Sequence, residues 1–149
     1  MPGNFSMQRS EIPLSLKSRG TYVLFLYLKK SQRVRVGSLG EIFFKKGYYL
    51  YVGSAMNGFY GRIKRYLHGG GKKHWHIDYL LEIAELKGIL LIPSDERLEE
   101  YVARRLSVHF EGIKGFGSTD TRLPSHLFHV GSFKAPCDDQ KIPFDRDRK

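Results

Sequence analysis

One apolar run near the start of the chain limits its possible folds more than any other feature. Residues 21–28 read T-Y-V-L-F-L-Y-L, and Lys29 and Lys30 follow directly. A run without polar alternation is typical of a strand that is buried on both faces. The chain must therefore form a sheet that is covered on each side. Its 149 residues are enough for one domain with a core of that kind.

The rest of the chain mixes strand-like and helix-like segments. Further strands are expected at residues 33–36, 42–44, 48–52, 86–92 and 127–130. One helix is expected from an N-cap at Asn57 to the glycines at 69–71, a second over 74–83, and a third from Ser94 or Asp95 to about Phe110. The sum predicts an α/β or α+β fold, a small mixed sheet flanked by helices.

This organisation predicts a single folded unit with two polar ends. We expect residues 1–13 to form a loose N-terminal arm, 14–134 the domain, and 135–149 a polar C-terminal tail. The start of the chain lacks the apolar centre of a signal peptide, and no apolar run has the length of a membrane span. We therefore expect a cytoplasmic protein that has no membrane partner.

The composition adds a hint of function and excludes some chemistry. Lysine and arginine number 25 against 15 acidic residues, a net charge of +10, and the pI is near 9.8. Such an excess favours a polyanionic partner, most often nucleic acid, although charge that only maintains solubility would look the same. Cys137 is the only cysteine, so an internal disulfide and a thiolate zinc cluster are excluded, and no disulfide-linked partner is expected.

Helical spacing after residue 57 directs one arginine toward the sheet. If Phe59 is set at 0°, Ile63 falls at about 40° and Arg62 at about −60°, on the edge of the apolar stripe. Lys64 and Arg65 fall outside the stripe and are expected to face water. Arg62 is thus expected to lean toward the sheet, either as a functional group or with its stem lying along the edge of the stripe.

The third predicted helix places a carboxylate among apolar neighbours. If Leu98 is set at 0°, Glu99 falls at about 100°, within the apolar arc, and Glu100 at about 200°, outside it. A carboxylate there is costly unless a cation or hydrogen-bond donors meet it. A metal ion or Arg62 would meet that need, whereas a Glu99 that reaches solvent at the rim would have no such role.

A basic segment follows the strand at residues 48–52. Residues 53–73 contain no acid, and aromatic residues are interleaved with the cations Arg62, Lys64, Arg65, Lys72 and Lys73. This pattern predicts a surface that contacts phosphates, with a solvated basic helix face as the alternative.

The order of these pieces resembles the GIY-YIG nuclease superfamily. Gly20-Thr21-Tyr22 opens the first strand, Tyr51-Val52-Gly53 lies in a later one, and a helix arginine and a glutamate follow. The resemblance is closer to a branch of small stand-alone prokaryotic proteins, some fused to DNA-repair glycosylases. It covers residues 20–130 through the segments 51–55, 61–67, 74–81, 115–120 and 125–128. That branch usually has cysteines near Asp120, where this chain has Thr121 and Leu123.

The resemblance implies a site and a function. Tyr22, Tyr51, Arg62 and Glu99 take the catalytic positions, and Glu99 holds a single Mg²⁺ or Mn²⁺. Glu100 replaces Glu99 if the helix register differs, and core packing is the alternative role for both tyrosines. His76 and Lys73 are expected to line the site, beside Lys64, Arg65 and Lys72 as nucleic-acid contacts.

The implied activity is metal-dependent cleavage of DNA, directed by DNA structure in repair or recombination. A non-catalytic nucleic-acid-binding module on the same scaffold is the alternative. An RNA partner is less favoured, because the sequence has no stacking-sheet RNA-binding motif.

Overall fold

The computed structural model of the chain describes residues 14–68, 72–117 and 125–132. The predicted arm and tail, Cys137, the glycines at 69–71 and the stretch that holds Asp120, Thr121 and Leu123 lie outside the described residues. Within the described ranges no helix has the length and apolar character needed to cross a membrane.

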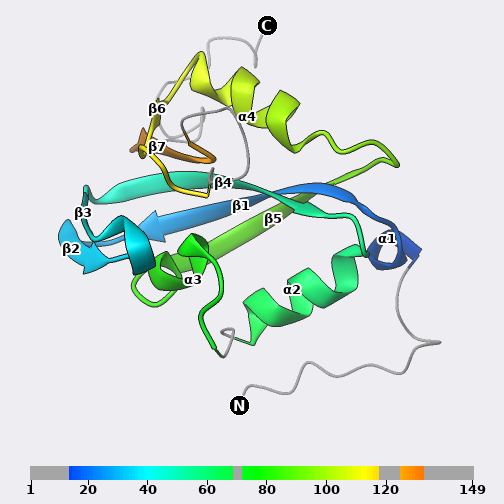
Figure 1. Ribbon diagram of the computed structural model, residues 1–149, viewed down its shortest axis with the longest axis horizontal. Helices are drawn as coiled ribbons and strands as arrows, with labels where there is room; N and C mark the ends of the chain where they lie inside the picture. The colour runs from blue at the N-terminus through cyan, green and yellow to red at the C-terminus, as the bar shows by residue number, and fades with distance from the viewer. Residues whose placement is uncertain (1–13, 69–71, 118–124, 133–149) are drawn as a thin grey trace, which may run out of the picture.

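A five-stranded sheet forms the centre of the described structure (Figure 1). Its order is β5-β1-β4-β7-β6, formed by Glu85–Pro93, Gly20–Leu28, Gly47–Ala55, Leu127–Gly131 and Glu111–Gly112. A smaller sheet pairs β2 (Gln32–Arg35) with β3 (Glu41–Phe44), and the 3-10 turn η2 (Gly37–Leu39) connects them. All the strand pairings are antiparallel, so the predicted α+β class is confirmed, with an antiparallel rather than a mixed sheet.

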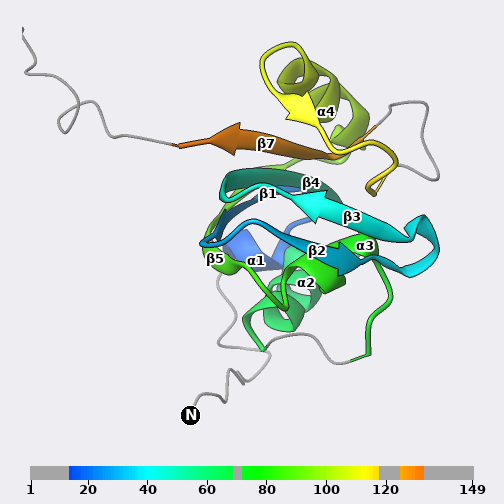
Figure 2. The same ribbon diagram turned by 90° about the vertical axis from the view of Figure 1, so that its left-hand side faces the viewer.

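Helices cover both faces of the larger sheet. One face is covered by α2 (Phe59–Leu67) and α3 (His76–Leu80), and the other by α4 (Glu99–Ser107), as Figures 1 and 2 show. The short α1 (Leu14–Lys17) precedes β1. The prediction of a strand buried on both faces is confirmed for β1, in which only Phe25 is exposed.

The alternation of side chains along the strands divides the core in two. Tyr22, Leu24 and Leu26 of β1 point into the larger core, on the side of α2 and α3. Val23 of the same strand packs with Ala103 of α4 in the smaller core. The tyrosines of interest therefore belong to the face that α2 covers.

All three predicted helices have boundaries that differ from the sequence prediction. The turn before α2 has Gly58 at φ +112°, a conformation suited to glycine, so the helix begins at Phe59 after Gly58 rather than after Asn57. The Ser94 hydroxyl accepts a hydrogen bond from the Glu96 N–H, and this local turn delays α4 until Glu99. The predicted ends also move, since α3 covers only His76–Leu80 and α4 stops at Ser107 rather than near 110.

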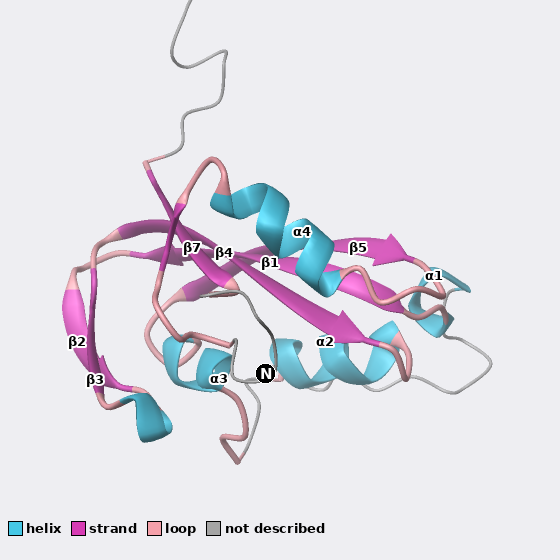
Figure 3. Ribbon diagram, turned by 45° about the horizontal axis from the view of Figure 1, so that its top comes forward, coloured by secondary structure: helices cyan, strands magenta, loops and turns pink. Residues whose placement is uncertain are grey.

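The sheet has an open edge beside the end of β4. Strand β1 pairs with β4 along its full length, but β7 pairs with β4 only from Tyr48 to Tyr51. Among the described residues, Gly53–Ala55 therefore have no strand on that side. Figure 3 shows α4 above the sheet and α2 below it, so residues from both layers can meet around this edge.

Candidate active site

A cavity of about 600 Å³ opens at this edge. Tyr22 of β1, Tyr51 of β4, Arg62 of α2 and Glu99 of α4 all line it. His76, at the start of α3, lines it as well. The structure thus brings the four predicted catalytic residues together from four separate elements.

Close packing explains why glycine occupies positions 20 and 53 in the tripeptides 20–22 and 51–53. Gly53 lies opposite Tyr22 in the β1–β4 register, and a Cβ on Gly53 would lie 2.3 Å from the Tyr22 ring. A Cβ on Gly20 would lie 2.2 Å from the Ile92 carbonyl oxygen of β5. Neither position has room for a side chain, so glycine is needed for the close approach of neighbouring groups.

The tyrosine hydroxyls in the cavity are neutral donors. Tyr22 Oη and Tyr66 Oη are 2.5 Å apart and share a hydrogen bond. Burial is the main cause that raises the pKa of Tyr22 and of Tyr51 well above its ordinary value, against the opposing effect of Arg62. The Glu99 carboxylate further raises the pKa of Tyr51. Both hydroxyls therefore keep their protons at neutral pH.

Arg62 rests against the only tryptophan of the chain. Its guanidinium carbon lies 4.3 Å from the centre of the Trp75 ring, within the range of a cation–π contact. The side chain is half-buried and faces the cavity beside Tyr22, so Arg62 leans toward the sheet as the helical spacing predicts. The Trp75 ring thus limits the positions that this guanidinium can adopt.

The prediction that Arg65 faces water is wrong. Arg65 Nη2 lies 2.6 Å from Asp78 Oδ2, and the arginine side chain is only 19% exposed. The same carboxylate oxygen accepts the backbone N–H groups of His74 and Trp75. Asp78 is buried at the start of α3 and needs these partners. Arg65 therefore fixes the segment that carries Trp75, and its phosphate-binding role stays a prediction.

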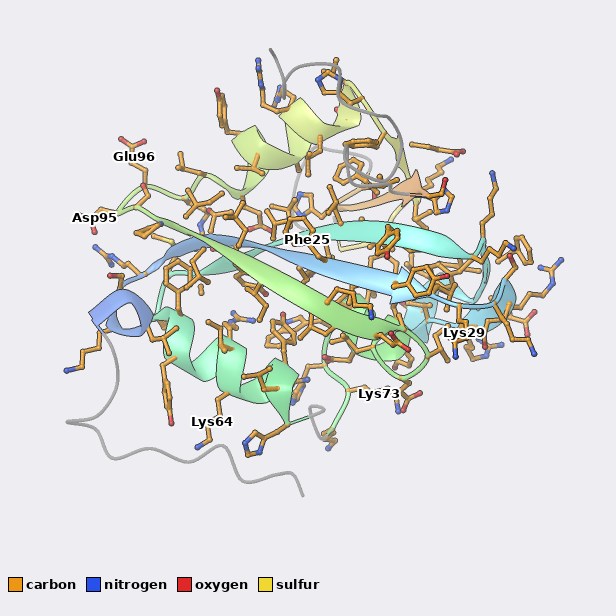
Figure 4. All side chains as sticks on the ribbon, turned by 180° about the vertical axis from the view of Figure 1, so that it is seen from behind. Phe25, Lys29, Lys64, Lys73, Asp95 and Glu96 are labelled. Carbon is orange, nitrogen blue, oxygen red and sulfur yellow. The ribbon has the colours of Figure 1, made fainter. Side chains whose placement is uncertain are left out.

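The three predicted lysines lie outside the cavity. Lys64 is exposed on the side of α2 that points away from the sheet, as Figure 4 shows. Lys72 is also exposed, and Lys73 Nζ forms a 2.6 Å surface ion pair with Glu82. Such surface pairs are weak, so a phosphate could displace this one. Any contact of these lysines with nucleic acid would involve nucleotides that lie outside the cavity.

Glu99 is held from two sides. Its side chain is 17% exposed, and Oε2 lies 2.9 Å from Nδ1 of the fully buried His126. This is an ion-pair distance, although the geometry falls outside that of a well-aligned hydrogen bond. Arg97 Nη1 lies 3.9 Å from Glu99 Oε1 and donates a hydrogen bond to Ser54 Oγ.

The comparisons with known proteins identify a family. A model described as "Domain of unknown function DUF123" matches residues 21–145. The chain belongs to the DUF123 family. No curated protein and no solved structure matches it. The matched range includes every residue that lines the cavity, and the description of the family names no activity.

The cavity carboxylates of this DUF123 chain suit Mg²⁺ better than Zn²⁺. Within the ranges that the structure describes, no three His, Cys, Asp or Glu side chains gather as a ligand cluster. Zn²⁺ sites use three or four such ligands. Mg²⁺ is usually held by one or two carboxylates, with water and substrate phosphates as its other ligands. Glu99 and Glu100 both line the cavity, and they suit the second arrangement.

His76 has a defined hydrogen-bonding state. Its Nδ1 accepts the backbone N–H of Gly117 at 2.8 Å, and burial lowers its pKa. A neutral ring whose Nδ1 accepts must carry its proton on Nε2. His76 of this DUF123 chain is therefore suited to donate a hydrogen bond from Nε2.

Sequence reasoning missed four residues around the cavity. Tyr66 lay within the segment 61–67 of the resemblance but had no role assigned. Trp75 and His126 lay within segments that resemble the nuclease branch, but neither had a role assigned. Arg97 had no signal, because a loop residue has no periodicity. Trp75 could have been found as the only tryptophan, placed just after the basic segment 53–73.

Proposed function

We propose that this protein is a metal-dependent DNA endonuclease with GIY-YIG-type chemistry. The observation that carries the proposal is convergence. Tyr22, Tyr51, Arg62 and Glu99 lie far apart in the chain, yet they line one cavity at the edge of the sheet. Motif letters alone would not require the glutamate of α4 to reach the tyrosines on the opposite face.

Arg62 would bind the scissile phosphate. A guanidinium presents paired N–H donors to two phosphate oxygens and keeps its charge at any relevant pH. The Trp75 ring beneath it restricts its motion, which lowers the entropy lost when the phosphate binds. Negative charge that develops on the phosphate during cleavage would be stabilised at this position.

The tyrosines would orient groups rather than remove protons. Their pKa values are raised by burial, so a hydroxyl in this cavity is a poor general base. Tyr51 and Tyr22 would instead donate hydrogen bonds to the attacking water or to a phosphate oxygen. The bond between Tyr22 and Tyr66 holds one of these hydroxyls in place.

Glu99 would hold the metal ion, with Glu100 as the second candidate ligand. The half-buried position of Glu99 limits its access to water on one side while it still lines the cavity. When bound, Mg²⁺ or Mn²⁺ would polarise the phosphate and stabilise the leaving oxygen.

The charge and the size of the cavity support the choice of substrate. A net charge of +10 favours a polyanion. A cavity of about 600 Å³ has the size of a small-molecule site, so it accommodates part of one strand rather than a duplex. Flapped, branched or damaged DNA offers such a strand, and we place the activity in repair or recombination.

The test is cleavage of labelled DNA of several shapes by the purified protein, with Mg²⁺ and with Mn²⁺. Replacement of Glu99 by Gln should abolish cleavage while DNA binding persists. Glu96→Gln is the matched control, because Glu96 is exposed and does not line the cavity. Glu100→Gln tests whether Glu100, rather than Glu99, holds the ion.

Three other outcomes would change the proposal. Unchanged cleavage by Glu99→Gln would refute the role of that residue. Salt-sensitive DNA binding without cleavage of any shape would favour the non-catalytic binding module. Stronger competition by RNA than by DNA of matched shape would indicate an RNA partner.

A further inference from the structure

Two basic groups lie within ion-pair distance of the Glu99 carboxylate in the described structure, and of these His126 is the buried one. Its side chain has no exposed surface, and its Nδ1 lies 2.9 Å from Glu99 Oε2. The other contact of Glu99 comes from Arg97, which is 65% exposed and lies farther away, at 3.9 Å. A buried ring holds one position, whereas an exposed arginine samples many. His126 therefore has the greater influence on the orientation of Glu99.

The backbone of His126 is fixed on two sides. Its N–H donates to the Phe116 carbonyl at 2.9 Å, and its carbonyl accepts the Val52 N–H at 3.0 Å. The second bond ties the backbone of His126 to β4, the strand that carries Tyr51. A Cβ on Gly117 would lie 3.1 Å from the Tyr51 ring and 3.4 Å from His126 Cβ, so the surrounding space is closely filled.

Glu99, by contrast, begins its helix without a side-chain cap. It is the first residue of α4, and the N-cap residue Leu98 provides no side-chain cap. The first turn of a helix frays more easily when it is uncapped. The carboxylate thus depends on tertiary contacts for its position.

We propose that His126 is a positioning residue for the Glu99 carboxylate, holding Oε2 so that the divalent ion can bind the group in one orientation. This inference rests on the proposed function, because it requires Glu99 to be the metal ligand. Ligating carboxylates are commonly held by such neighbours, and loss of a neighbour weakens metal binding by roughly 10- to 100-fold.

The experiment measures binding of Mn²⁺ alone to the full-length protein, from the electron paramagnetic resonance signal of the free ion. His126→Leu should weaken binding by roughly 10- to 100-fold. His126→Asn places an amide nitrogen where Nδ1 lies, so its affinity should stay within about threefold of the wild type. His126→Gln carries its amide one bond farther and should bind more weakly than His126→Asn.

His129→Leu is the matched control. It lies on β7, the strand that follows His126, but its ring contacts the Lys46 carbonyl just before the start of β4. Its Mn²⁺ affinity should equal that of the wild type. Urea unfolding of each variant reports stability separately, and the Asn and Gln variants give the comparison if the leucine variant fails to fold.

The outcomes separate this inference from the proposed function. Equal Mn²⁺ affinity in the wild type, His126→Leu and His126→Gln would overturn the positioning role alone. Equal weakening by the Asn and Gln variants would also overturn it, since a donor at the Nδ1 position would then have no effect. If the wild type binds no Mn²⁺, or Glu99→Gln binds it equally well, the metal assignment of Glu99 fails and the inference fails with it.

Discussion

Replacement of Gly53 by Ala should disrupt the site by a mechanism that the structure specifies. The new Cβ would lie 2.3 Å from both Cζ and Oη of Tyr22, whereas ordinary contacts begin at 3.4 Å. The ring must therefore move by about 1 Å, or the strands must separate. Movement of the ring also breaks the Tyr22–Tyr66 hydrogen bond. Overpacking of this kind should lower the free energy of unfolding by about 2–3 kcal/mol.

Urea unfolding of the wild type and of four variants, Gly53→Ala being the first, tests this mechanism. Gly88→Ala on β5 is the control, since a Cβ there would meet no atom within 4 Å. It should leave stability unchanged or raise it by about 0.5 kcal/mol, because glycine is unfavourable in a strand. The third variant is Tyr22→Leu, which lacks the ring atoms that clash, and the fourth combines Tyr22→Leu with Gly53→Ala.

The double variant decides the result. With Leu at position 22, Gly53→Ala should cost less than about 1 kcal/mol, so the two substitutions should show a coupling of 1–2 kcal/mol. If Gly53→Ala costs the same in both backgrounds, the Tyr22 ring does not explain the need for glycine. A Gly53→Ala protein as stable as the wild type would refute the packing argument altogether.

Further substitutions test other buried polar groups. Thr21→Val should raise the free energy of unfolding in urea by about 1 kcal/mol, because the fully buried Thr21 hydroxyl has no hydrogen-bond partner among the described residues; a loss of stability would contradict this. Burial lowers the pKa of His76. The stability that the neutral His76 ring contributes is therefore fully present above the pKa of 6.5 that histidine has in the unfolded chain, and it is lost as pH falls through the folded pKa. Urea unfolding between pH 8 and 5 should therefore show a steeper loss for the wild type than for His76→Asn, and parallel curves would exclude this origin. Asp78→Asn should cost about 3 kcal/mol by leaving the charge of Arg65 poorly compensated, and it should shift the fluorescence of Trp75, whereas unchanged emission would show that Asp78 does not hold that segment.

The sequence alone determined the elements that depend on local pattern. The apolar run at residues 21–28 required a strand that is covered on both faces, and helical spacing placed Arg62 on the side of α2 that faces the sheet. Both properties follow from the repeat of a single element, which the order of residues fixes directly. The same reasoning placed Glu99 within the apolar arc of its helix.

Only the tertiary structure decided what these residues touch. The Asp78 carboxylate draws Arg65 away from water. The contact of Glu99 with His126 joins the start of α4 to the residue that precedes β7. Such contacts depend on where separate elements end and how they pack, and no periodicity within one segment carries that information.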